Sequence, residues 1–246
     1  MQDHAVTLLR KAHNIVVLTG AGISTESGIP DFRSPGSPWL ASPPVDYSAF
    51  ISQAEARRQY WETRRTFSSQ VRAAQPNAAH VALAELERRQ RLLGIITQNF
   101  DGLHQDAGNT PARVVELHGT SREAACSLCG IHSSMEELQV RIDQGEADPQ
   151  CTLCGGYLKS ATILFGQHIP ADVLARAKAL TESCDLFMVV GSSLKVSPAA
   201  NLPRLAVQNA APLLIVNLIP TPLDSHADAV IHEQAGLALP RLVEML

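Results

Sequence analysis

Six short stretches of the chain are almost continuously apolar and rich in β-branched residues, a pattern that predicts buried strands. Amphipathic patterns with a helical period lie between several of them, as in residues 77–90 and 170–183. Strands that are apolar on both faces and alternate with helices are typical of a parallel sheet covered on both sides. The pattern therefore predicts an α/β fold. The expected strands are residues 14–19, 92–99, 113–118, 185–193, 212–218 and 228–232.

Two segments interrupt this alternation, and we interpret both as insertions into the sheet domain. Residues 34–76 begin with a stretch rich in Pro and Ser and then take on a helical pattern, whereas residues 121–160 contain few apolar positions. We expect the two insertions to form a smaller second domain. The sheet domain would then consist of residues 1–33, 77–120 and 161–246.

The composition and charge of the chain exclude several classes of protein. The chain has 246 residues, of which 45% are hydrophobic, and a formal net charge of −4. No apolar stretch approaches the roughly 20 residues that a membrane-spanning helix needs, and the sequence has no basic patch of the kind that binds nucleic acid. The first 14 residues have an amphipathic helical pattern without the apolar core of a signal peptide. We therefore expect a cytoplasmic monomer that binds neither nucleic acid nor membranes.

Four of the five cysteines form two closely spaced pairs, Cys126 with Cys129 and Cys151 with Cys154. This spacing is typical of a zinc ion held by four thiolates, which leaves no open coordination position and is therefore structural. Because the surrounding insertion is poor in apolar residues, we expect the metal to supply much of its folding free energy. The alternatives are four reduced thiols, or a zinc ribbon that binds nucleic acid, which the acidic net charge disfavours. Cys184 precedes an apolar strand and is interpreted as a small core side chain.

The first predicted strand ends in a glycine-rich stretch, LTGAGISTESGIPDFR, at residues 18–33. Gly20 and Gly22 match the first two glycines of the G-x-G-x-x-G turn that binds dinucleotide phosphates, but Thr25 replaces the third. Glycine permits a tight turn and a close approach of backbone N–H groups to phosphate. Two glycines alone are also compatible with an ordinary turn. The later Gly28 and the proline two residues on would direct the chain away from the sheet, into a lid over a cofactor.

Polar side chains follow two other predicted strands, at the edge where open α/β sheets place their ligands. His118 ends one strand, and its near-neutral pKa suits a general base. Asn99 and Asp101 lie at the end of another, and an amide offers both a donor and an acceptor to a ribose or a water. Without further evidence, each has a structural alternative. His118 could be a surface histidine, and Asn99 and Asp101 could stabilise a turn with their side chains.

Six motifs together resemble those of the sirtuins, which are NAD-dependent protein lysine deacylases. They occur in the order seen in that family and cover nearly the whole chain, from Ile15 to about Gly236. The resemblance implies a Rossmann-like sheet domain with NAD as co-substrate, a smaller inserted domain with one structural zinc ion, and a cleft between them. The motifs are GAGISTESGIPDFR (20–33), TQNFDGLH (97–104), ELHG (116–119), FGQHIP (165–170), GSSLKVSPAA (191–200) and IVNL (215–218).

The resemblance also implies roles for individual residues. His118 would deprotonate a hydroxyl of the nicotinamide ribose and Asn99 would orient the ribose or a water, as the two catalytic residues. An acyl-lysine peptide would add as a strand between residues 166–167 and 195–197, with the lysine in an apolar tunnel. The cofactor contacts would be Gly20, Ala21, Gly22, Thr25, Ile29, Asp31, Phe32, Arg33, Gln98, Asn99, Phe100, Asp101, Gly191, Ser192, Ser193, Asn217, Leu218 and Ala235. The substrate contacts would be Ile163, Phe165, Gly166, Val196, Trp61 and Arg64.

Two positions depart from the pattern that the resemblance implies. Phe100 stands where sirtuins usually carry Ile or Val, in the nicotinamide pocket, and its larger ring is expected to alter nicotinamide affinity. Trp61 and Arg64 lie in the register of the Tyr-x-x-Arg motif of desuccinylating sirtuins, so the Arg is kept and the phenol hydroxyl is lost. Arg64 is either a partner for an acidic acyl group or a solvated helix charge. We expect deacetylation as the default, with other acyl groups open.

The predicted activity is the removal of acyl groups from lysine side chains of proteins or peptides, with release of nicotinamide and O-acyl-ADP-ribose. A protein ADP-ribosyltransferase that uses the same NAD site is one alternative. A redox enzyme of the Rossmann type is disfavoured by the late third glycine. A non-catalytic NAD-binding or acyl-lysine-binding module is disfavoured by the presence of both His118 and Asn99.

Overall fold

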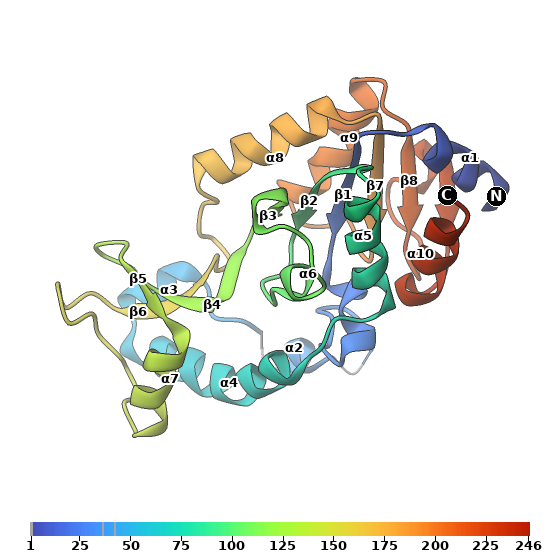
Figure 1. The fold of residues 1–246 in the computed structure, drawn as a ribbon. Helices are drawn as coiled ribbons and strands as arrows, with labels where there is room; N and C mark the ends of the chain where they lie inside the picture. Colours follow the sequence, from blue (N-terminus) through green and yellow to red (C-terminus); the bar gives the residue numbers. More distant parts are fainter. Residues whose placement is uncertain (1, 36, 42) are drawn as a thin grey trace.

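A computed structural model describes residues 2–35, 37–41 and 43–246, and its centre is a six-stranded parallel sheet (Figure 1). The strand order is β3-β2-β1-β7-β8-β9, so the chain builds one half of the sheet outward from β1 and then crosses to build the other. This is the doubly wound arrangement of Rossmann-like folds, and it confirms the predicted α/β fold. The strands are β1 (Ile15–Thr19), β2 (Leu92–Thr97), β3 (Val114–Glu116), β7 (Leu186–Val190), β8 (Leu213–Val216) and β9 (Ala229–Ile231).

Helices cover both faces of this sheet because its strands carry apolar side chains on both sides. Along β1, Ile15 and Val17 belong to one buried cluster, whereas Val16 and Leu18 belong to the other. Each cluster is completed by the apolar face of the helices that pack on it. The first cluster includes residues of α1 (Gln2–Lys11), α5 (Ala78–Arg88) and α10 (Ala235–Glu244), and the second includes residues of α8 (Ala171–Ser183) and α9 (Leu202–Gln208).

All six predicted strands are present, but most of them end two or three residues earlier than predicted. The residues beyond these strand ends, 98–99, 117–118, 191–193 and 217–218, leave the sheet and enter loops. An apolar pattern does not mark this point, because the first residues of each loop are still packed or partly buried. The loops formed there turn out to carry most of the candidate site.

The two insertions fold together into a smaller unit that lies beside the sheet domain (Figure 1). Phe50 and Trp61 from the first insertion are buried in one cluster with Leu138 and Ile142 from the second. The expectation that residues 121–160 lack an apolar core is therefore wrong, because the apolar side chains of α7 complete a core shared by both insertions. The elements are α3 (Tyr47–Ser52), α4 (Ala54–Ala73), α7 (Met135–Asp143) and an antiparallel sheet of β4 (Gly119–Cys126), β5 (His132–Ser134) and β6 (Leu158–Thr162).

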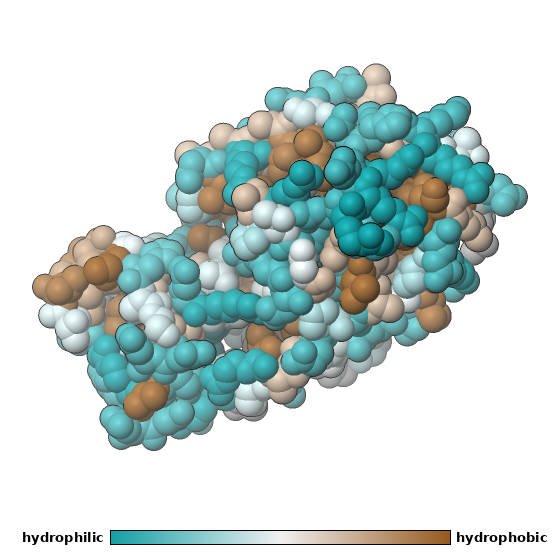
Figure 2. Space-filling model, in the orientation of Figure 1, coloured by the Kyte–Doolittle hydropathy of each residue, from teal (hydrophilic) through white to brown (hydrophobic). Residues whose placement is uncertain are grey.

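The molecular face in Figure 2 is mostly hydrophilic, with several separate apolar patches, one of which lies at the outer end of the small domain, at the left of the view. Leu128 and Leu153, which lie in the two Cys-x-x-Cys turns, are 71% and 72% exposed. In each turn the first cysteine, Cys126 or Cys151, is buried, whereas the leucine two residues later faces the solvent.

Short elements complete the fold. β4 begins at Gly119 and so crosses the predicted domain boundary between residues 120 and 121; the boundaries themselves stay a prediction.

In the part of the chain that the structure describes, no helix combines the length and the apolar composition that crossing a membrane requires. The short helices are α2 (Pro38–Ala41) and α6 (Leu103–Asp106), and 3₁₀ turns occur at residues 21–23, 25–27, 111–113, 199–201 and 224–226.

Candidate functional site

A cleft of about 980 Å³ lies between the carboxyl ends of the central strands and the small domain. Open parallel sheets bind ligands at this edge, where loops and backbone N–H groups converge. Three of the predicted residues, Ile29, Asp101 and Trp61, do not line the cleft. The predicted residues that do are Gly20, Ala21, Gly22, Thr25, Asp31, Phe32, Arg33, Arg64, Gln98, Asn99, Phe100, His118, Ile163, Phe165, Gly166, Gly191, Ser192, Ser193, Val196, Asn217, Leu218 and Ala235.

Gly20 and Gly22 lie directly against the loop that follows β7. A Cβ atom on either glycine would lie 2.8 Å from the carbonyl oxygen of Gly191. Gly191 itself has a φ of +62°, and a Cβ there would lie 2.3 Å from the backbone nitrogen of Ile23. The glycines therefore allow the loops after β1 and β7 to pack directly against each other. This packing is a second reason for glycine here, besides the predicted close approach of a phosphate.

The missing third glycine has a local explanation. Thr25 begins a second short 3₁₀ turn, and Gly28 ends that turn with a left-handed φ of +87°. The Thr25 hydroxyl donates to the carbonyl oxygen of Gly22 at 3.0 Å, which ties the second turn to the first. The third glycine is thus needed where the chain reverses toward the lid, and no long helix starts in this segment.

His118 lies half-buried in the cleft wall, between the end of β3 and the start of β4. Its Nδ1 is 2.9 Å from the carbonyl oxygen of Gln98. Because a carbonyl oxygen only accepts hydrogen bonds, Nδ1 carries the hydrogen and Nε2 keeps a free lone pair. Burial lowers the pKa of His118 below its usual 6.5, although the contact with Gln98 opposes this effect. The imidazole is therefore neutral at pH 7 and able to accept a proton.

Asn99 and Gln98 follow β2 and are held through their side-chain NH₂ groups. Nδ2 of Asn99 donates to the carbonyl oxygen of Gly20 at 3.2 Å and to Oγ of Ser24 at 3.1 Å. Nε2 of Gln98 donates to Oγ of Ser192 at 2.8 Å. With the NH₂ groups committed, the amide oxygens are the atoms that would accept a hydrogen bond from a ribose hydroxyl or a water.

The structure places Asp101 and Ile29 behind the lining of the cleft, and both are buried. The Asp101 carboxylate accepts hydrogen bonds from Oγ of Ser24 at 2.8 Å and from the N–H of Leu103 at 3.0 Å. Ile29 is buried in an apolar cluster with Phe67. Both residues therefore support the lining of the cleft from behind.

The segment after Gly28 folds as a lid that is joined to the loop after β7. Nε of Arg33 donates to Oγ of Ser193 at 3.0 Å. Phe32 stacks on Trp39 with 5.2 Å between ring centroids, and Trp39 meets Phe67 edge-to-face at 4.7 Å. Trp39 and Phe67 both line the cleft. The sequence analysis missed them as site residues because they lie in the insertion assigned to the small domain; aromatic residues in that polar stretch were the available signal.

Five of the six residues predicted to contact the substrate line the cleft together with His118. The N–H of Ile163, which follows β6, donates to the carbonyl oxygen of His118 at 2.7 Å. Phe165, Gly166 and Val196 also line this part of the cleft. Phe165 is 54% exposed, so its ring is available to cover an apolar side chain that enters here.

The predicted pair of Trp61 and Arg64 is divided between the core and the cleft. Trp61 is 3% exposed and packs edge-to-face on Tyr60 within the small-domain core. Arg64 is half-buried, lines the cleft and donates to the carbonyl oxygen of Ser121 at 3.3 Å, so it is not a solvated helix charge. Tyr60 lines the cleft as well, and its hydroxyl lies 2.7 Å from Oγ of Ser160.

Near α10 the cleft is lined by the glycine-rich loop after β1 and by the segments that follow β8 and precede α10. Asn217 and Leu218 follow β8, and Ala235 begins α10. Glu26, which the sequence analysis did not single out, also lines the cleft and accepts a hydrogen bond from the N–H of Gly236 at 2.7 Å. This contact joins the glycine-rich loop to the first turn of α10.

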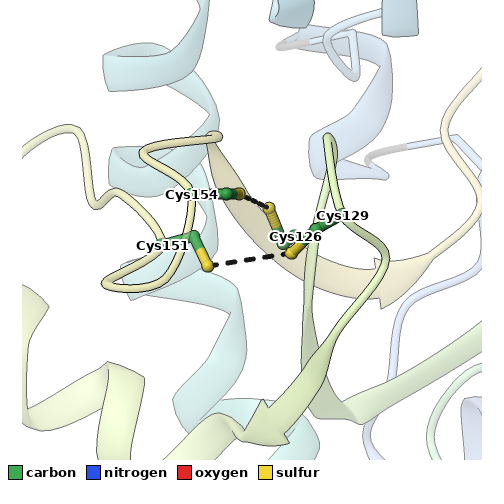
Figure 3. Close-up of side chains that lie close together, drawn as sticks. All are labelled: Cys126, Cys129, Cys151 and Cys154. Carbon is green, nitrogen blue, oxygen red and sulfur yellow. Dashed lines mark hydrogen bonds between the residues drawn. The ribbon is translucent and has the colours of Figure 1, made fainter.

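The four paired cysteines lie together in the small domain, with all four sulfur atoms within 4.8 Å of one another (Figure 3). Sγ of Cys126 is 3.5 Å from that of Cys154, and Sγ of Cys129 is 3.9 Å from that of Cys151. Four sulfur atoms placed tetrahedrally about 2.3 Å from a zinc ion are about 3.8 Å apart. The arrangement therefore fits the predicted structural zinc ion.

Backbone groups support this cysteine cluster. The N–H of Leu128 donates to Sγ of Cys126, and the N–H of Gly156 donates to Sγ of Cys154, each at 3.4 Å. A Cβ atom on Gly156 would lie 2.7 Å from Sγ of Cys126, so a side chain at this position would displace a ligand. Such contacts orient thiolates and offset part of their negative charge.

The fold and the cleft define a Rossmann-like nucleotide-binding protein with an inserted metal-binding domain. Residues 20–198 match the sequence model of the Sir2 family. The chain is 47% identical to NAD-dependent protein deacetylase 2 of Streptomyces coelicolor, over 94% of this chain and 97% of that protein. It is also similar to a solved structure of Sir2 with a p53 peptide and NAD⁺, with a TM-score of 0.90 and 35% identity over 99% of this chain and 98% of that one.

A further Sir2 structure, with a deacetylated p53 peptide and 3′-O-acetyl-ADP-ribose, has a TM-score of 0.91 and 34% identity, over 99% of this chain and 97% of that one. The family model covers more than half of the chain, and the Streptomyces relative is well above the identity at which family membership is secure. This chain belongs to the Sir2 family, the sirtuins.

Proposed function

We propose that this protein is an NAD-dependent protein lysine deacylase, which transfers the acyl group of a modified lysine to ADP-ribose and releases nicotinamide. The observation that carries the proposal is the placement of His118, a neutral imidazole with a free Nε2, in a cleft formed by several strand-end loops. NAD supplies the ribose carbon to which the acyl oxygen bonds when nicotinamide leaves. The related structures with NAD⁺ and with acetyl-ADP-ribose support this assignment.

We assign the catalytic steps to two residues. His118 accepts the proton of a ribose hydroxyl through Nε2, while its contact with Gln98 fixes the tautomer and the ring orientation. Asn99 presents its amide oxygen to the ribose or to a water. The lid and its aromatic residues exclude bulk water, which would otherwise intercept the reactive sugar.

We assign the cofactor contacts to the walls of the cleft. The backbone at Gly20–Gly22 and the loop at 191–193 would bind the phosphates, and Arg33, which is hydrogen-bonded to Ser193, would hold the lid over them. Asn217, Leu218 and Ala235, which line the cleft, would bind the adenosine end. Phe100 would lie against the nicotinamide.

The acyl-lysine segment pairs as a strand between residues 166–167 and 195–197. Pairing through the main chain tolerates many sequences, so we expect several protein or peptide substrates. Ile163 and Phe165 line the path of the lysine side chain toward His118. We take the enzyme to act as a monomer in the cytoplasm, without nucleic acid or a membrane.

Acetyl is the proposed default acyl group. Trp61 is buried in the small-domain core, so recognition of an acidic acyl group depends on Arg64. The Tyr60 hydroxyl lies in the same part of the cleft, but it already has Ser160 as a partner. A single arginine without a second donor gives a weaker site for a carboxylate than a complete pair.

The test is incubation of the protein with NAD and a panel of acetyl-, succinyl- and longer-acyl-lysine peptides, read by mass spectrometry. We expect free lysine peptide, nicotinamide and O-acyl-ADP-ribose. An ADP-ribosylated peptide without O-acyl-ADP-ribose would instead identify an ADP-ribosyltransferase and contradict the proposal.

The His118→Ala variant tests the catalytic assignment. Loss of a general base lowers the rate by about 100-fold or more, so we expect kcat to fall at least that far while the protein stays folded. His13→Ala, at an exposed histidine near α1, is the matched control and should retain full activity. Full activity in His118→Ala would refute the role of this residue.

A further inference from the structure

The loop after β2 forms part of the cleft wall through Phe100, and the first residues of β4 hold this loop from behind. The N–H and the hydroxyl of Ser121 both donate to the carbonyl oxygen of Phe100, at 2.9 Å and 2.7 Å. Ser121 belongs to the strand that leads into the small domain. The small domain is thus hydrogen-bonded directly to the backbone of the cleft wall.

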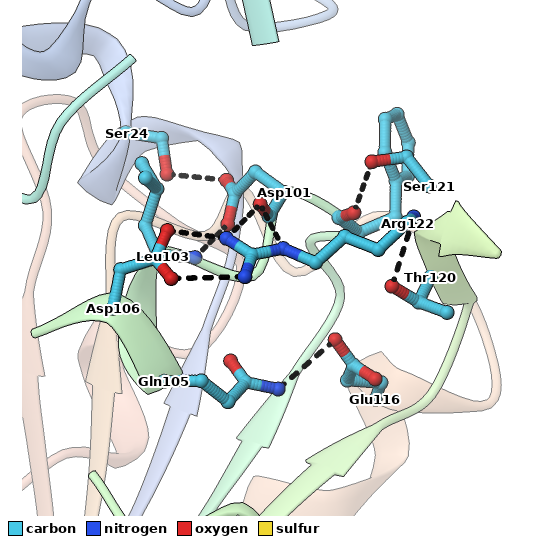
Figure 4. Close-up of polar contacts among 10 residues, drawn as sticks. Ser24, Asp101, Leu103, Gln105, Asp106, Glu116, Thr120, Ser121 and Arg122 are labelled. Carbon is cyan, nitrogen blue, oxygen red and sulfur yellow. Dashed lines mark hydrogen bonds and ion pairs between the residues drawn. The ribbon is translucent and has the colours of Figure 1, made fainter. Parts of the chain in front are cut away.

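Arg122 makes a similar contact with the backbone of the next residue, Asp101 (Figure 4). Its Nη2 and Nε donate to the carbonyl oxygen of Asp101 at 3.2 Å and 3.4 Å. The same guanidinium forms a two-point ion pair with Asp106 of α6, in which Nη1 lies 2.9 Å from Oδ1. Arg122 therefore connects β4 of the small domain to both ends of the segment from residue 101 to residue 106.

A glycine gives this guanidinium the room that it occupies. Gly102 has a φ of +75°, and a Cβ atom on it would lie 2.1 Å from Nε and 2.4 Å from Cζ of Arg122. The guanidinium therefore lies against bare backbone between the Asp101 carbonyl and Asp106. A fit this close between a side chain and a glycine makes the position of the loop depend on the position of Arg122.

A second cavity of about 300 Å³ lies behind Phe100 and is lined by Phe100, Asp101 and Arg122 together with residues of α4. Phe100 thus separates two cavities, because it lines the main cleft as well. Where empty space replaces packed side chains, hydrogen bonds carry more of the local restraint.

We propose that Arg122 is a positioning residue that fixes the Phe100–Asp101 wall of the cleft from the small domain and thereby sets the affinity of the site for nicotinamide. The inference rests on the proposed function, in which nicotinamide binds beside Phe100. It adds to that function that Arg122, a residue outside the main cleft, affects nicotinamide binding by holding the backbone carbonyl group of Asp101, next to the Phe100 carbonyl held by Ser121.

The Arg122→Ala variant tests the proposal. We expect the inhibition constant of nicotinamide and the KM for NAD to rise together by about 5-fold, the ratio that one ordinary hydrogen bond is worth. The KM for the acyl-lysine peptide should not change. Arg88→Ala, which removes an arginine from an ion pair with Glu85 on α5, is the matched control and should leave all three constants unchanged. A purely structural role for Arg122 would lower the active fraction and Tm without moving the nicotinamide constant, and that result would overturn the proposal.

A charge-swapped variant separates the two contacts of Arg122. In Arg122→Asp with Asp106→Arg the ion pair can form again, but the donors to the Asp101 carbonyl no longer come from β4. We expect Tm to recover while the nicotinamide constant stays raised. A return of that constant to its wild-type value would overturn the role of the carbonyl contact.

Hydrogen exchange of the ligand-free protein provides a readout that needs no activity. We expect the amides of residues 99–103 to exchange faster in Arg122→Ala than in wild type, because the loop opens more often. Unchanged exchange there would overturn the proposal even if the wild-type protein proved to have no deacylase activity. Conversely, an active wild type with an unchanged nicotinamide constant in Arg122→Ala would leave the proposed function intact and remove only this inference.

Discussion

Two histidines beneath the candidate site are buried, and no acidic side chain among the described residues is hydrogen-bonded to either of them. His80 of α5 and His104 of α6 lie with 5.0 Å between ring centroids, and Nε2 of His104 is 2.9 Å from Oγ1 of Thr19. Burial lowers the pKa of His80 to about 4 and that of His104 to about 3. Both side chains are therefore neutral in the folded protein across the physiological range, and they serve the packing under the loop that carries Asp101.

Acid should destabilise the protein through these two side chains. In the unfolded chain each has a pKa near 6.5, so below that pH the unfolded state binds protons that the folded state does not. Their contribution is complete above pH 6.5 and is lost as the pH falls toward the folded values of about 4 and 3. At pH 5 the loss should be about 2 kcal/mol for each histidine, measurable by denaturant unfolding at pH 8 and pH 5.

Variants identify the source of this acid sensitivity. His104→Gln should lose less stability than wild type between pH 8 and pH 5, because one of the two titrating groups is gone. His4→Gln, at an exposed histidine of α1, should behave as wild type. Identical losses in all three proteins would assign the sensitivity to other groups.

The lowered pKa of His118 predicts the pH dependence of the reaction. A base must be neutral to act, so activity is lost as the pH falls through the folded pKa of this residue. Because burial holds that pKa below 6.5, the acidic limb of kcat/KM for NAD should have its midpoint below pH 6.5. A midpoint above 6.5, measured with a peptide of fixed charge, would contradict the neutral state inferred from the structure.

At the scale of elements, one arginine of α4 holds the segment that leads to the second cysteine pair. Arg57 is 4% exposed, and its Nε and Nη2 lie 2.8 Å and 2.9 Å from the two carboxylate oxygens of Asp148. Its guanidinium also lies 3.5 Å from the ring centroid of Tyr157. The neighbouring Arg58 makes an ion pair with Glu55 at the surface, where the two side chains are 55% and 81% exposed.

These two adjacent arginines form a matched experiment. Arg57→Ala leaves a partly buried carboxylate without its partner and should lower the free energy of unfolding by about 3 kcal/mol. Arg58→Ala removes an exposed ion pair and should cost less than about 0.5 kcal/mol. Thermal or denaturant unfolding of both variants measures the difference, and equal losses would show that α4 is not joined to the cysteine segment in this way.

The elements also show how far the sequence could predict the structure. The hydrophobic pattern predicted every strand of the parallel sheet, because a short, continuous run of apolar residues is typical of a buried strand. It overran the strand ends at residues 98–99 and 191–193, where packed loop residues have the same composition as a strand. It also missed the small-domain core, because Phe50 and Ile142 become neighbours only after two distant insertions meet.

The same limit applies to the site. His118 and the residues after the glycines could be proposed because strand ends and motifs place them at one edge. Trp61 could not be placed, since its helical register alone does not tell whether it faces the core or the cleft. Tyr60, Trp39 and Phe67 line the cleft from segments that contribute no strand to the sheet, so only the tertiary structure brings them there.

At the scale of the whole molecule, the two parts of the chain rest on different sources of stability. The sheet domain has two large apolar clusters, one on each face. Among the described residues, the small domain has one cluster of its own, which includes Cys126 and Cys151 themselves, while its Phe67 belongs to a further cluster shared with the sheet domain. A zinc ion held by the four thiolates would therefore complete this smaller core rather than replace it.

Removal of the metal should loosen the small domain and leave the sheet folded. With a chelator present, we expect faster hydrogen exchange over residues 120–160 and unchanged exchange in β1 and β7. Cys129→Ala should bind no zinc in elemental analysis, whereas Cys184→Ala, at the cysteine outside the cluster, should keep one equivalent. Simultaneous loss of both regions, or full zinc content in Cys129→Ala, would contradict this division.

The second of the two insertions leaves the sheet domain and returns to it at the same place. β4 begins at Gly119, immediately after His118, and on the way back Thr162 pairs with Gly119 while Ile163 bonds to the His118 carbonyl. The outgoing and returning strands are thus joined to each other at the backbone of His118. Because the two strands are tied together at this point, changes in length or sequence farther out in the excursion should leave the backbone of His118 in place.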